Sequence, residues 1–249
     1  MQPPNADADA GAALPEYTVR RSSRARRARI TVSPRHGVVV TVPAGWRGFD
    51  AAAIVAERRE WIAEVSEQFG EQRALWTVDP AELLPDRVHL EATGEEWAVH
   101  YRATAATTVR VIESSDTLTV SGATQDATAC LAALQRWLQA AANERLVPRI
   151  DELARRHGLV PTRVTVRGQH ARWGGCSGRG AITLNRALLF LPEDLVAAVM
   201  VHELAHLSHP NHSPRFWAHL AKLDPLCDVH RAAIRDAWNR VPAWAERRA

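Results

Sequence analysis

Residues 195–206 read LVAAVMVHELAH, an apolar run that ends in two histidines and a glutamate. The preceding residues 191–194, LPED, place a proline and two acidic residues where a helix would begin. Positions i and i+4 share one face of a helix, so His202 and His206 can offer two imidazoles to one metal ion. Glu203 then lies beside the metal, where a general base for a water molecule is needed. We therefore expect a buried helix that carries a metal site, because two histidines and a glutamate are costly to bury without a partner.

A third protein ligand is expected, because catalytic zinc sites bind three side chains and keep one position for water. Glu246, near the C-terminus, is the only glutamate after Glu203 and is a poor candidate. His212 has the spacing of the metzincin motif H-E-x-x-H-x-x-G-x-x-H, but His209 stands at its glycine and no methionine follows for a Met-turn. Pro210 disfavours helix at the residue before it, so the chain can turn back there. We favour His212 as the third ligand; the rival is His209, and more distant candidates are His219 and His230.

Two segments before this helix alternate polar and apolar residues, as half-buried strands do. They are residues 162–167, TRVTVR, and residues 180–185, GAITLN. Residues 172–179 between them are rich in Gly and Ser, which predicts a loop or a wide hairpin turn. We expect two antiparallel strands that form a small sheet beside the metal site, with an edge strand that can hold an extended peptide by backbone pairing.

Four motifs in this part of the chain occur together in a known family. They are RWGGCS at 172–177, GAITLN at 180–185, HELAH at 202–206 and NHSPRFW at 211–217. In this combination the chain resembles the YgjP-like metal-dependent hydrolases, zincin-type proteins described as SprT-like or WLM-related metallopeptidases. The resemblance extends over about residues 17–245, and it departs from the family pattern at Gly175, where serine is usual. It implies a zinc ion bound by His202, His206 and His212, with Glu203 as the catalytic acid and base.

The preferred interpretation is a zinc metallopeptidase that acts on a peptide or protein. We assign three further residues to substrate binding: Arg172, Trp173 and Asn185. Arg172 could stabilise an oxyanion or form a structural ion pair. Trp173 could line the mouth of a pocket or pack in the core. Cys176 has no cysteine near it in sequence and is interpreted as a small structural residue rather than a metal ligand.

Two other classes of function remain open. The family resemblance also allows hydrolysis of a phosphoanhydride, such as a nucleoside triphosphate that yields a monophosphate and pyrophosphate. Arginines could then bind the phosphate oxygens, at positions 163, 167, 172 and 179. Alternatively, His209 could complete a closed four-ligand site in a non-catalytic module that binds zinc or nucleic acid.

Length and composition are those of a globular protein of one or two domains, with 249 residues of which 46% are hydrophobic. The three cysteines, at 130, 176 and 227, form no close pair, which favours a reduced cytosol over a disulfide scaffold. The N-terminus is polar and no apolar run reaches the length needed to span a bilayer. We therefore expect a soluble cytoplasmic protein with no membrane partner.

The expected class is α+β, with a β-rich N-terminal region followed by a zincin-like helical domain that contains the small antiparallel sheet. We expect a flexible tail at 1–16, a β-rich region at 17–125 with one helix at 49–68, and a metal-binding catalytic domain at 126–249 that begins with a long helix. Six arginines lie between Arg20 and Arg29. Because the net charge is only +3, we interpret them as a solvated strand face rather than a nucleic-acid site.

Overall fold

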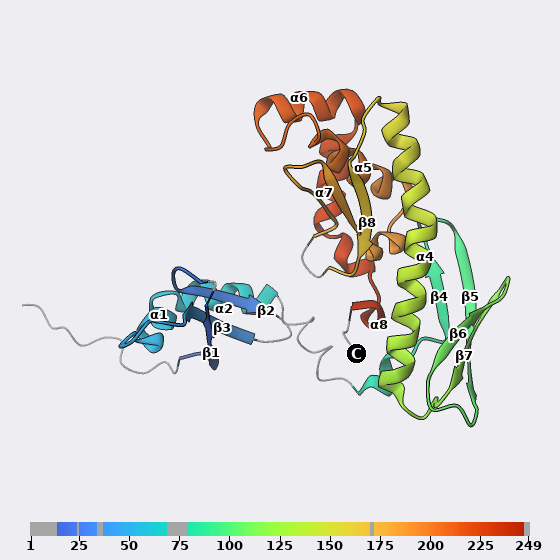
Figure 1. Cartoon of the computed structure of the whole chain (residues 1–249), viewed down its shortest axis with the longest axis horizontal. Helices are drawn as coiled ribbons and strands as arrows, with labels where there is room; N and C mark the ends of the chain where they lie inside the picture. The colour runs from blue at the N-terminus through green and yellow to red at the C-terminus, as the bar shows by residue number, and fades with distance from the viewer. Residues whose placement is uncertain (1–13, 24, 34–36, 69–78, 170–171, 247–249) are drawn as a thin grey trace, which may run out of the picture. The chain divides into compact units, whose positions relative to one another are not determined.

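The chain divides into two compact units, Met1–Val78 and Asp79–Ala249. The computed structural model describes residues 14–23, 25–33, 37–68, 79–169 and 172–246 (Figure 1). The expected α+β class is confirmed, but the boundary that we placed between residues 125 and 126 moves to 78/79. Its position was wrong because the strands of residues 87–122 share one hydrophobic core with the long helix that follows them. Most of the tail expected at 1–16 lies outside the described residues.

The first unit is a three-stranded sheet with two helices packed against one face. Its central strand β3 pairs in parallel with β1 and antiparallel with β2. The small core is formed by Val38, Val40, Val42, Val55 and Ile62. The elements in chain order are β1 (Tyr17–Ser22), β2 (Arg29–Ser33), β3 (Gly37–Pro43), α1 (Ala51–Glu57) and α2 (Arg59–Gln68).

Two helices stand where we expected one over residues 49–68, because the backbone leaves helical geometry at Arg58. The basic stretch contributes to the fold of this unit. Arg20 donates to Thr41 at 3.4 Å, and Arg21 donates to the carbonyl oxygen of Trp46 at 2.7 Å. These two arginines therefore have structural partners on the sheet and on the loop after it.

The second unit is organised by one long helix, α4 (Ala127–Arg156), which buries twelve side chains. A four-stranded sheet packs along its N-terminal half, in the order β4-β5-β7-β6 (Figure 1). Asp126 caps the helix, and the helix continues through Pro148 without a break. The strands are β4 (Arg87–Leu90), β5 (Glu95–Ala103), β6 (Arg110–Glu113) and β7 (Thr117–Gly122), preceded by the 3-10 helix η1 (Pro80–Leu83).

A second sheet lies against the C-terminal half of α4, in the order β8-β10-β9. β8 (Arg163–Arg167) and β10 (Ala181–Asn185) pair in parallel, so the antiparallel arrangement expected for them is wrong. The reason is that the Gly-rich segment between them forms a strand of its own. This strand, β9 (Gly174–Cys176), makes the antiparallel hairpin with β10 and occupies the edge of the sheet.

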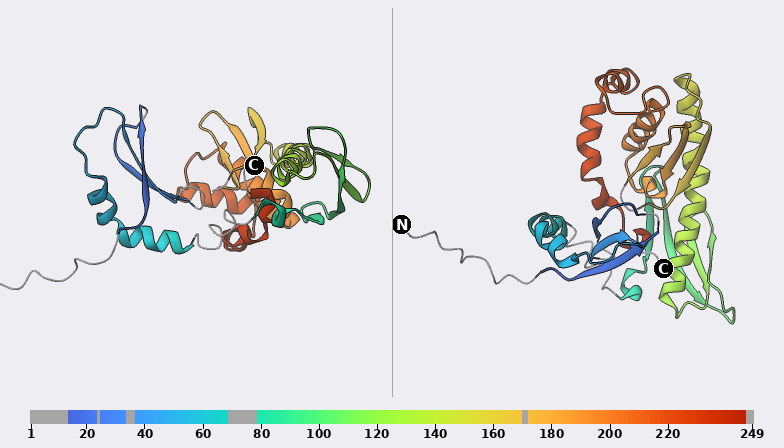
Figure 2. Two further views of the ribbon diagram at one scale, coloured as in Figure 1. Left: turned by 90° about the horizontal axis from the view of Figure 1, so that it is seen from below. Right: turned by 60° about the vertical axis from the view of Figure 1, so that its left-hand side comes forward.

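Helix α5 (Glu193–Ala205) follows this sheet and is covered on its other side by the C-terminal helices (Figure 2). Nine of its thirteen residues are buried, which agrees with the apolar run expected there. Ser213 caps α6 and Pro214 is its first residue. The remaining elements are η2 (Arg186–Phe190), α6 (Pro214–Leu223), α7 (Cys227–Arg235), η3 (Ala237–Arg240) and α8 (Ala243–Glu246). Within the described residues, no helix is both long enough and apolar enough to cross a bilayer.

Arg145 on α4 ties this helix to the edge of the first sheet of the second unit. Its guanidinium donates to both carboxylate oxygens of Glu95, one of them at 2.8 Å, and lies 3.3 Å from Glu113. The hydrogen bonds from Arg145 hold the pKa of Glu95 below its usual range. A carboxylate whose pKa is depressed in the folded state stabilises the fold above its unfolded pKa, and this contribution disappears as the pH falls through the folded pKa.

We predict that Glu95→Gln lowers the free energy of unfolding at pH 7 by no more than about 1 kcal/mol, because Glu95 is 36% exposed and water screens the pair. The difference from the unsubstituted protein should shrink as the pH falls below about 4, and urea unfolding followed by circular dichroism would measure it. Glu96→Gln is the matched control, since Glu96 pairs with Arg87 at the surface. A difference for Glu95→Gln that does not change with pH would contradict the assignment.

Candidate active site

Two histidines lie at the C-terminal end of α5. His202 is in the last turn, and His206 is the C-cap residue, with helical backbone angles and no further helical residue after it. The chain then folds back tightly, as the amide N–H groups of Ser208 and His209 both donate to the carbonyl oxygen of Ala205 at 3.1 Å. The helix thus ends before the point that we expected from Pro210, and the following loop returns to the ends of the two imidazoles.

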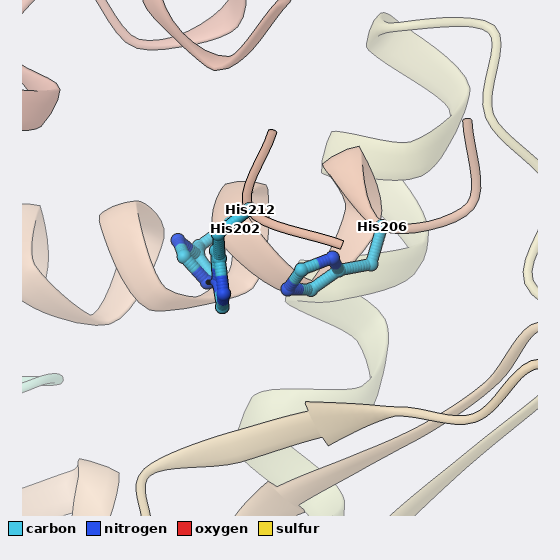
Figure 3. A group of neighbouring side chains, drawn as sticks. All are labelled: His202, His206 and His212. Carbon is cyan, nitrogen blue, oxygen red and sulfur yellow. Dashed lines mark hydrogen bonds between the residues drawn. The ribbon is translucent and has the colours of Figure 1, made fainter. Parts of the chain in front are cut away.

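His212 is the residue that this loop brings back. One ring nitrogen from each of His202, His206 and His212 lies within 4.8 Å of the others (Figure 3). The Nε2 atoms of His202 and His212 are 3.0 Å apart. The structure therefore brings together the three residues that the sequence analysis favoured, from the helix and from the loop that follows it.

Aromatic side chains hold His212 and His206 in place. The ring of Trp217 stacks on His212 at 5.5 Å, and the ring of Phe216 stacks on His206 at 4.5 Å. Arg231 from α7 packs over the ring of Trp217, with its guanidinium carbon 4.8 Å from the ring centroid. Because His212 is on a loop, this packing from α6 and α7 is what restricts the orientation of its ring.

The rival ligands point elsewhere. The ring of His209 lies 5.3 Å from that of His219, outside the group of converging nitrogens. The backbone of His209 does serve the site, because its carbonyl oxygen accepts a hydrogen bond from Nδ1 of His206 at 3.0 Å. That bond fixes the proton of His206 on Nδ1 and leaves Nε2 with a lone pair, as in most histidines that bind metals. His230 bonds Asp224 in the wall of a neighbouring pocket.

The charge state of His202 and His212 fits a metal cation. Burial, reinforced by the neighbouring His206 and His212, lowers the pKa of His202 to about 4. Burial and the charge of His206 also lower the pKa of His212. Both rings are therefore neutral at pH 7, with lone pairs available, and imidazole nitrogens are donors that suit zinc.

The side chain of Glu203, on α5, is buried at 7% exposure and faces β9. The backbone N–H of Cys176 donates to its carboxylate, whereas Oε2 has no hydrogen-bond partner among the described residues. Burial raises the pKa of Glu203 to about 7, opposed by the positive charge of Arg172 and by the bond from Cys176. A buried carboxyl oxygen without a partner is costly, which indicates that a further group, such as a water molecule, completes its bonding.

Gly174 leaves the space that this carboxylate occupies. A Cβ at position 174 would lie 2.8 Å from both Cγ and Oε1 of Glu203, so a side chain there would displace it. At Gly175, by contrast, the nearest atom to an added Cβ is Nη1 of Arg172 at 3.6 Å, an ordinary contact. Gly175, where the family usually has serine, therefore lies at a position where a small side chain would fit.

A cavity of about 260 Å³ opens beside His202 and Glu203. Arg172 and Trp173 both line it, as expected for residues that contact substrate. Trp173 is also a packing residue, because it is 7% exposed and stacks on Trp238 with ring centroids 4.0 Å apart. Trp173 thus both lines a cavity and packs in the core, as the two interpretations of the sequence proposed.

Asn185 does not reach this cavity. It is 1% exposed, and its amide nitrogen donates to the carbonyl oxygens of Gln169 and Arg172 at 2.7 and 2.9 Å. Its Oδ1 accepts from the backbone N–H of Ala187 at 3.0 Å and caps η2. The assignment of Asn185 to substrate binding is therefore replaced by a structural one, in which it fixes the backbone of Arg172 at the rim of the cavity.

Three other features of the site were not predicted from the sequence: the space at Gly174, the packing of Trp217 and the Asp224–His230 pair. A glycine in a strand often marks a close approach of another group, and this signal was available at position 174. The positions of Trp217 and of the Asp224–His230 pair depend on how α6 and α7 pack over α5, which no local pattern specifies.

We predict that His212→Ala lowers the affinity for zinc by more than about 100-fold, beyond the loss that is typical when an outer partner of a ligand is removed. His209→Ala should change the affinity far less, because only its backbone serves the site. Competition with a chromogenic chelator would measure both affinities. Equal losses for the two variants, or a loss only for His209→Ala, would contradict the assignment of His212.

Comparison with known proteins identifies the family of the chain. The chain is similar over 38% of its length to abylysin of Pyrococcus abyssi, whose solved structure is described as the crystal structure of a metallopeptidase zymogen; it is 26% identical, with 96% of that chain covered and a TM-score of 0.35. No match was found among curated proteins. The family described as YgjP-like, metallopeptidase domain, matches residues 26–237, which is most of the chain. The protein therefore belongs to the YgjP-like metallopeptidase family.

Proposed function

We propose that the protein is a zinc-dependent peptidase that acts on peptides or proteins, with zinc held by His202, His206 and His212 and with Glu203 as the catalytic base. The observation that carries the proposal is the juxtaposition of three converging imidazole nitrogens with a buried carboxylate at one cavity. The family supports a peptidase, and the donor set supports zinc.

When bound at such a site, zinc acts as a Lewis acid that lowers the pKa of a coordinated water and polarises a carbonyl group. The protein's own residues would transfer the protons in this reaction. Oε2 of Glu203 has no hydrogen-bond partner in the part of the chain that the structure describes, and it can accept a proton from the attacking water. The same carboxyl can then give that proton to the nitrogen of the departing amine. Its pKa of about 7 suits both transfers near neutral pH.

Arg172 would stabilise the negative charge that develops on the carbonyl oxygen. It lines the cavity, and its positive charge also acts on the carboxylate of Glu203. A preorganised cation at this position would favour the transition state over the bound substrate.

The edge strand β9 supports an extended peptide as the substrate. The backbones of residues 173 and 177 form hydrogen bonds with residues 185 and 181. Because every second residue of an antiparallel strand bonds the same neighbour, the N–H and C=O groups of Gly174 point away from β10. Gly174 also lines the cavity beside Glu203. A peptide that paired with this edge would pass the carboxylate with its backbone extended.

The two alternatives receive less support. Of the arginines at 163, 167, 172 and 179, only Arg172 lines the cavity; the other arginine there, Arg231, packs over Trp217 and pairs with Asp228. A closed four-ligand site would need the ring of His209, which lies against His219 instead. Assaying the zinc-loaded protein against a peptide library and a nucleoside triphosphate panel would separate peptidase from phosphoanhydride hydrolase. Release of pyrophosphate with no peptide cleavage would overturn the proposal.

We predict that Glu203→Gln lowers peptide hydrolysis by at least about 100-fold, because the amide cannot accept the proton of water. Zinc content should stay near that of the unsubstituted protein, since the three imidazoles are unchanged. Metal analysis and hydrolysis of labelled casein would be measured on the same preparation. Full activity with bound zinc would defeat the role of Glu203.

We predict that Gly174→Ala lowers hydrolysis by about 100-fold, because the new Cβ would displace the carboxylate of Glu203. Gly175→Ala is the matched control at the next residue and should be close to unchanged, since an added Cβ there makes only an ordinary contact. Both variants would be compared in the same assay after a check of their thermal stability. Similar activities for the two variants would show that the space at residue 174 does not position Glu203.

A further inference from the structure

The cavity extends beyond the catalytic groups into a pocket between three helices. Ala198 and Val199 of α5 form one wall, Leu220 of α6 a second, and Ile234 of α7 a third. These side chains are apolar, and they belong to the same cavity of about 260 Å³ that His202 and Glu203 line. Because His202 and Glu203 also line it, a group in this pocket would be attached close to the scissile bond.

Aromatic rings flank the same space. Trp173 and Trp217 both line the pocket. Each is held by a stacking partner, Trp238 for the first and His212 for the second. Rigid aromatic walls favour an aromatic occupant, because rings pack against one another in offset or edge-on arrangements.

Beside His202 and Glu203, the polar side chains that line the pocket are those of Arg172, Arg231 and a bonded pair, Asp224 and His230. Nδ1 of His230 lies 2.8 Å from Oδ2 of Asp224, and the two side chains are only 14% and 11% exposed. Oδ1 of Asp224 also accepts from the backbone N–H of Leu226 at 3.1 Å. Both residues of the pair line the pocket. Polar groups in an apolar wall lower the affinity for a purely apolar side chain, so the pair indicates a ligand that bonds to it.

The bond to Asp224 determines what His230 can offer. A carboxylate accepts hydrogen bonds, so it holds a proton on Nδ1 of the neutral imidazole and leaves Nε2 as an acceptor. Among the described residues, no hydrogen bond to Nε2 of His230 is present. Away from Glu203, the pocket thus combines aromatic and aliphatic walls with an acceptor on His230 that can bond an O–H donor.

We propose that this pocket binds the side chain of a tyrosine beside the scissile bond, with its hydroxyl donating to Nε2 of His230. The proposal rests on the peptidase function above and names the residue that the enzyme prefers. A phenylalanine would fill the same walls but would leave His230 unbonded, and a site built to bond a hydroxyl discriminates against the ligand that lacks it.

The first test measures cleavage of matched quenched-fluorescent peptides that differ only in having Tyr, Phe, Leu or Ala on either side of the cleaved bond. We expect kcat/KM for the best tyrosine peptide to exceed that for its phenylalanine partner by about threefold to tenfold, the size of one net hydrogen bond. His230→Leu should remove this preference while retaining cleavage of the phenylalanine peptide. His100→Leu, the same substitution on the exposed face of β5, is the control and should keep the preference.

The second test does not depend on hydrolysis. The metal-free protein would be titrated with 4-methylphenol and with toluene, and binding followed by NMR. We expect 4-methylphenol to bind more tightly than toluene, His230→Leu to weaken only the phenol, and Ile234→Trp to abolish both by filling the pocket.

The two tests separate the failure of each proposal. If 4-methylphenol shows the expected preference but no peptide is cleaved, the phenol site stands and the peptidase function fails. If peptides are cleaved but His230→Leu leaves the ratio of tyrosine to phenylalanine unchanged, the inference about His230 is overturned. Equal binding of the two small molecules would overturn it as well.

Discussion

Burying ionisable side chains in an apolar helix costs free energy, and contacts within the second unit offset that cost. α5 is packed between α4 and the C-terminal helices, yet it carries a buried Glu203 and a half-buried His202. The loop after the helix reduces the cost by bonding His206 and by returning His212 to the two rings. Among the described residues, one oxygen of Glu203 has no hydrogen-bond partner, and the three ring nitrogens converge beside it; a cation with its water would bond both.

The sequence was sufficient for the parts of the site that depend on helix geometry. The i, i+4 spacing of His202 and His206 follows from the repeat of a helix, and the apolar run around them requires burial. His212 could be favoured over His209 because proline disfavours helix at the residue before it. The structure agrees with the choice, although the helix ends earlier than that argument required, at Ala205.

The parts that were missed depend on contacts between distant residues. Alternation of polar and apolar residues identified β8 and β10 but cannot state their relative direction, which the intervening β9 decides. The boundary at 125/126 was wrong because strands and helices of similar composition can share one core. Asn185 was assigned to substrate from its place in a motif, whereas its burial makes it a clamp on the Arg172 backbone.

The most direct test of the account is the position of zinc in a crystal of the zinc-loaded protein, located by anomalous scattering at the zinc edge. The account predicts a single strong peak within about 2.0–2.1 Å of one ring nitrogen each of His202, His206 and His212. A peak bound by His209 or His219, or a ring of His212 turned away from the metal, would contradict it.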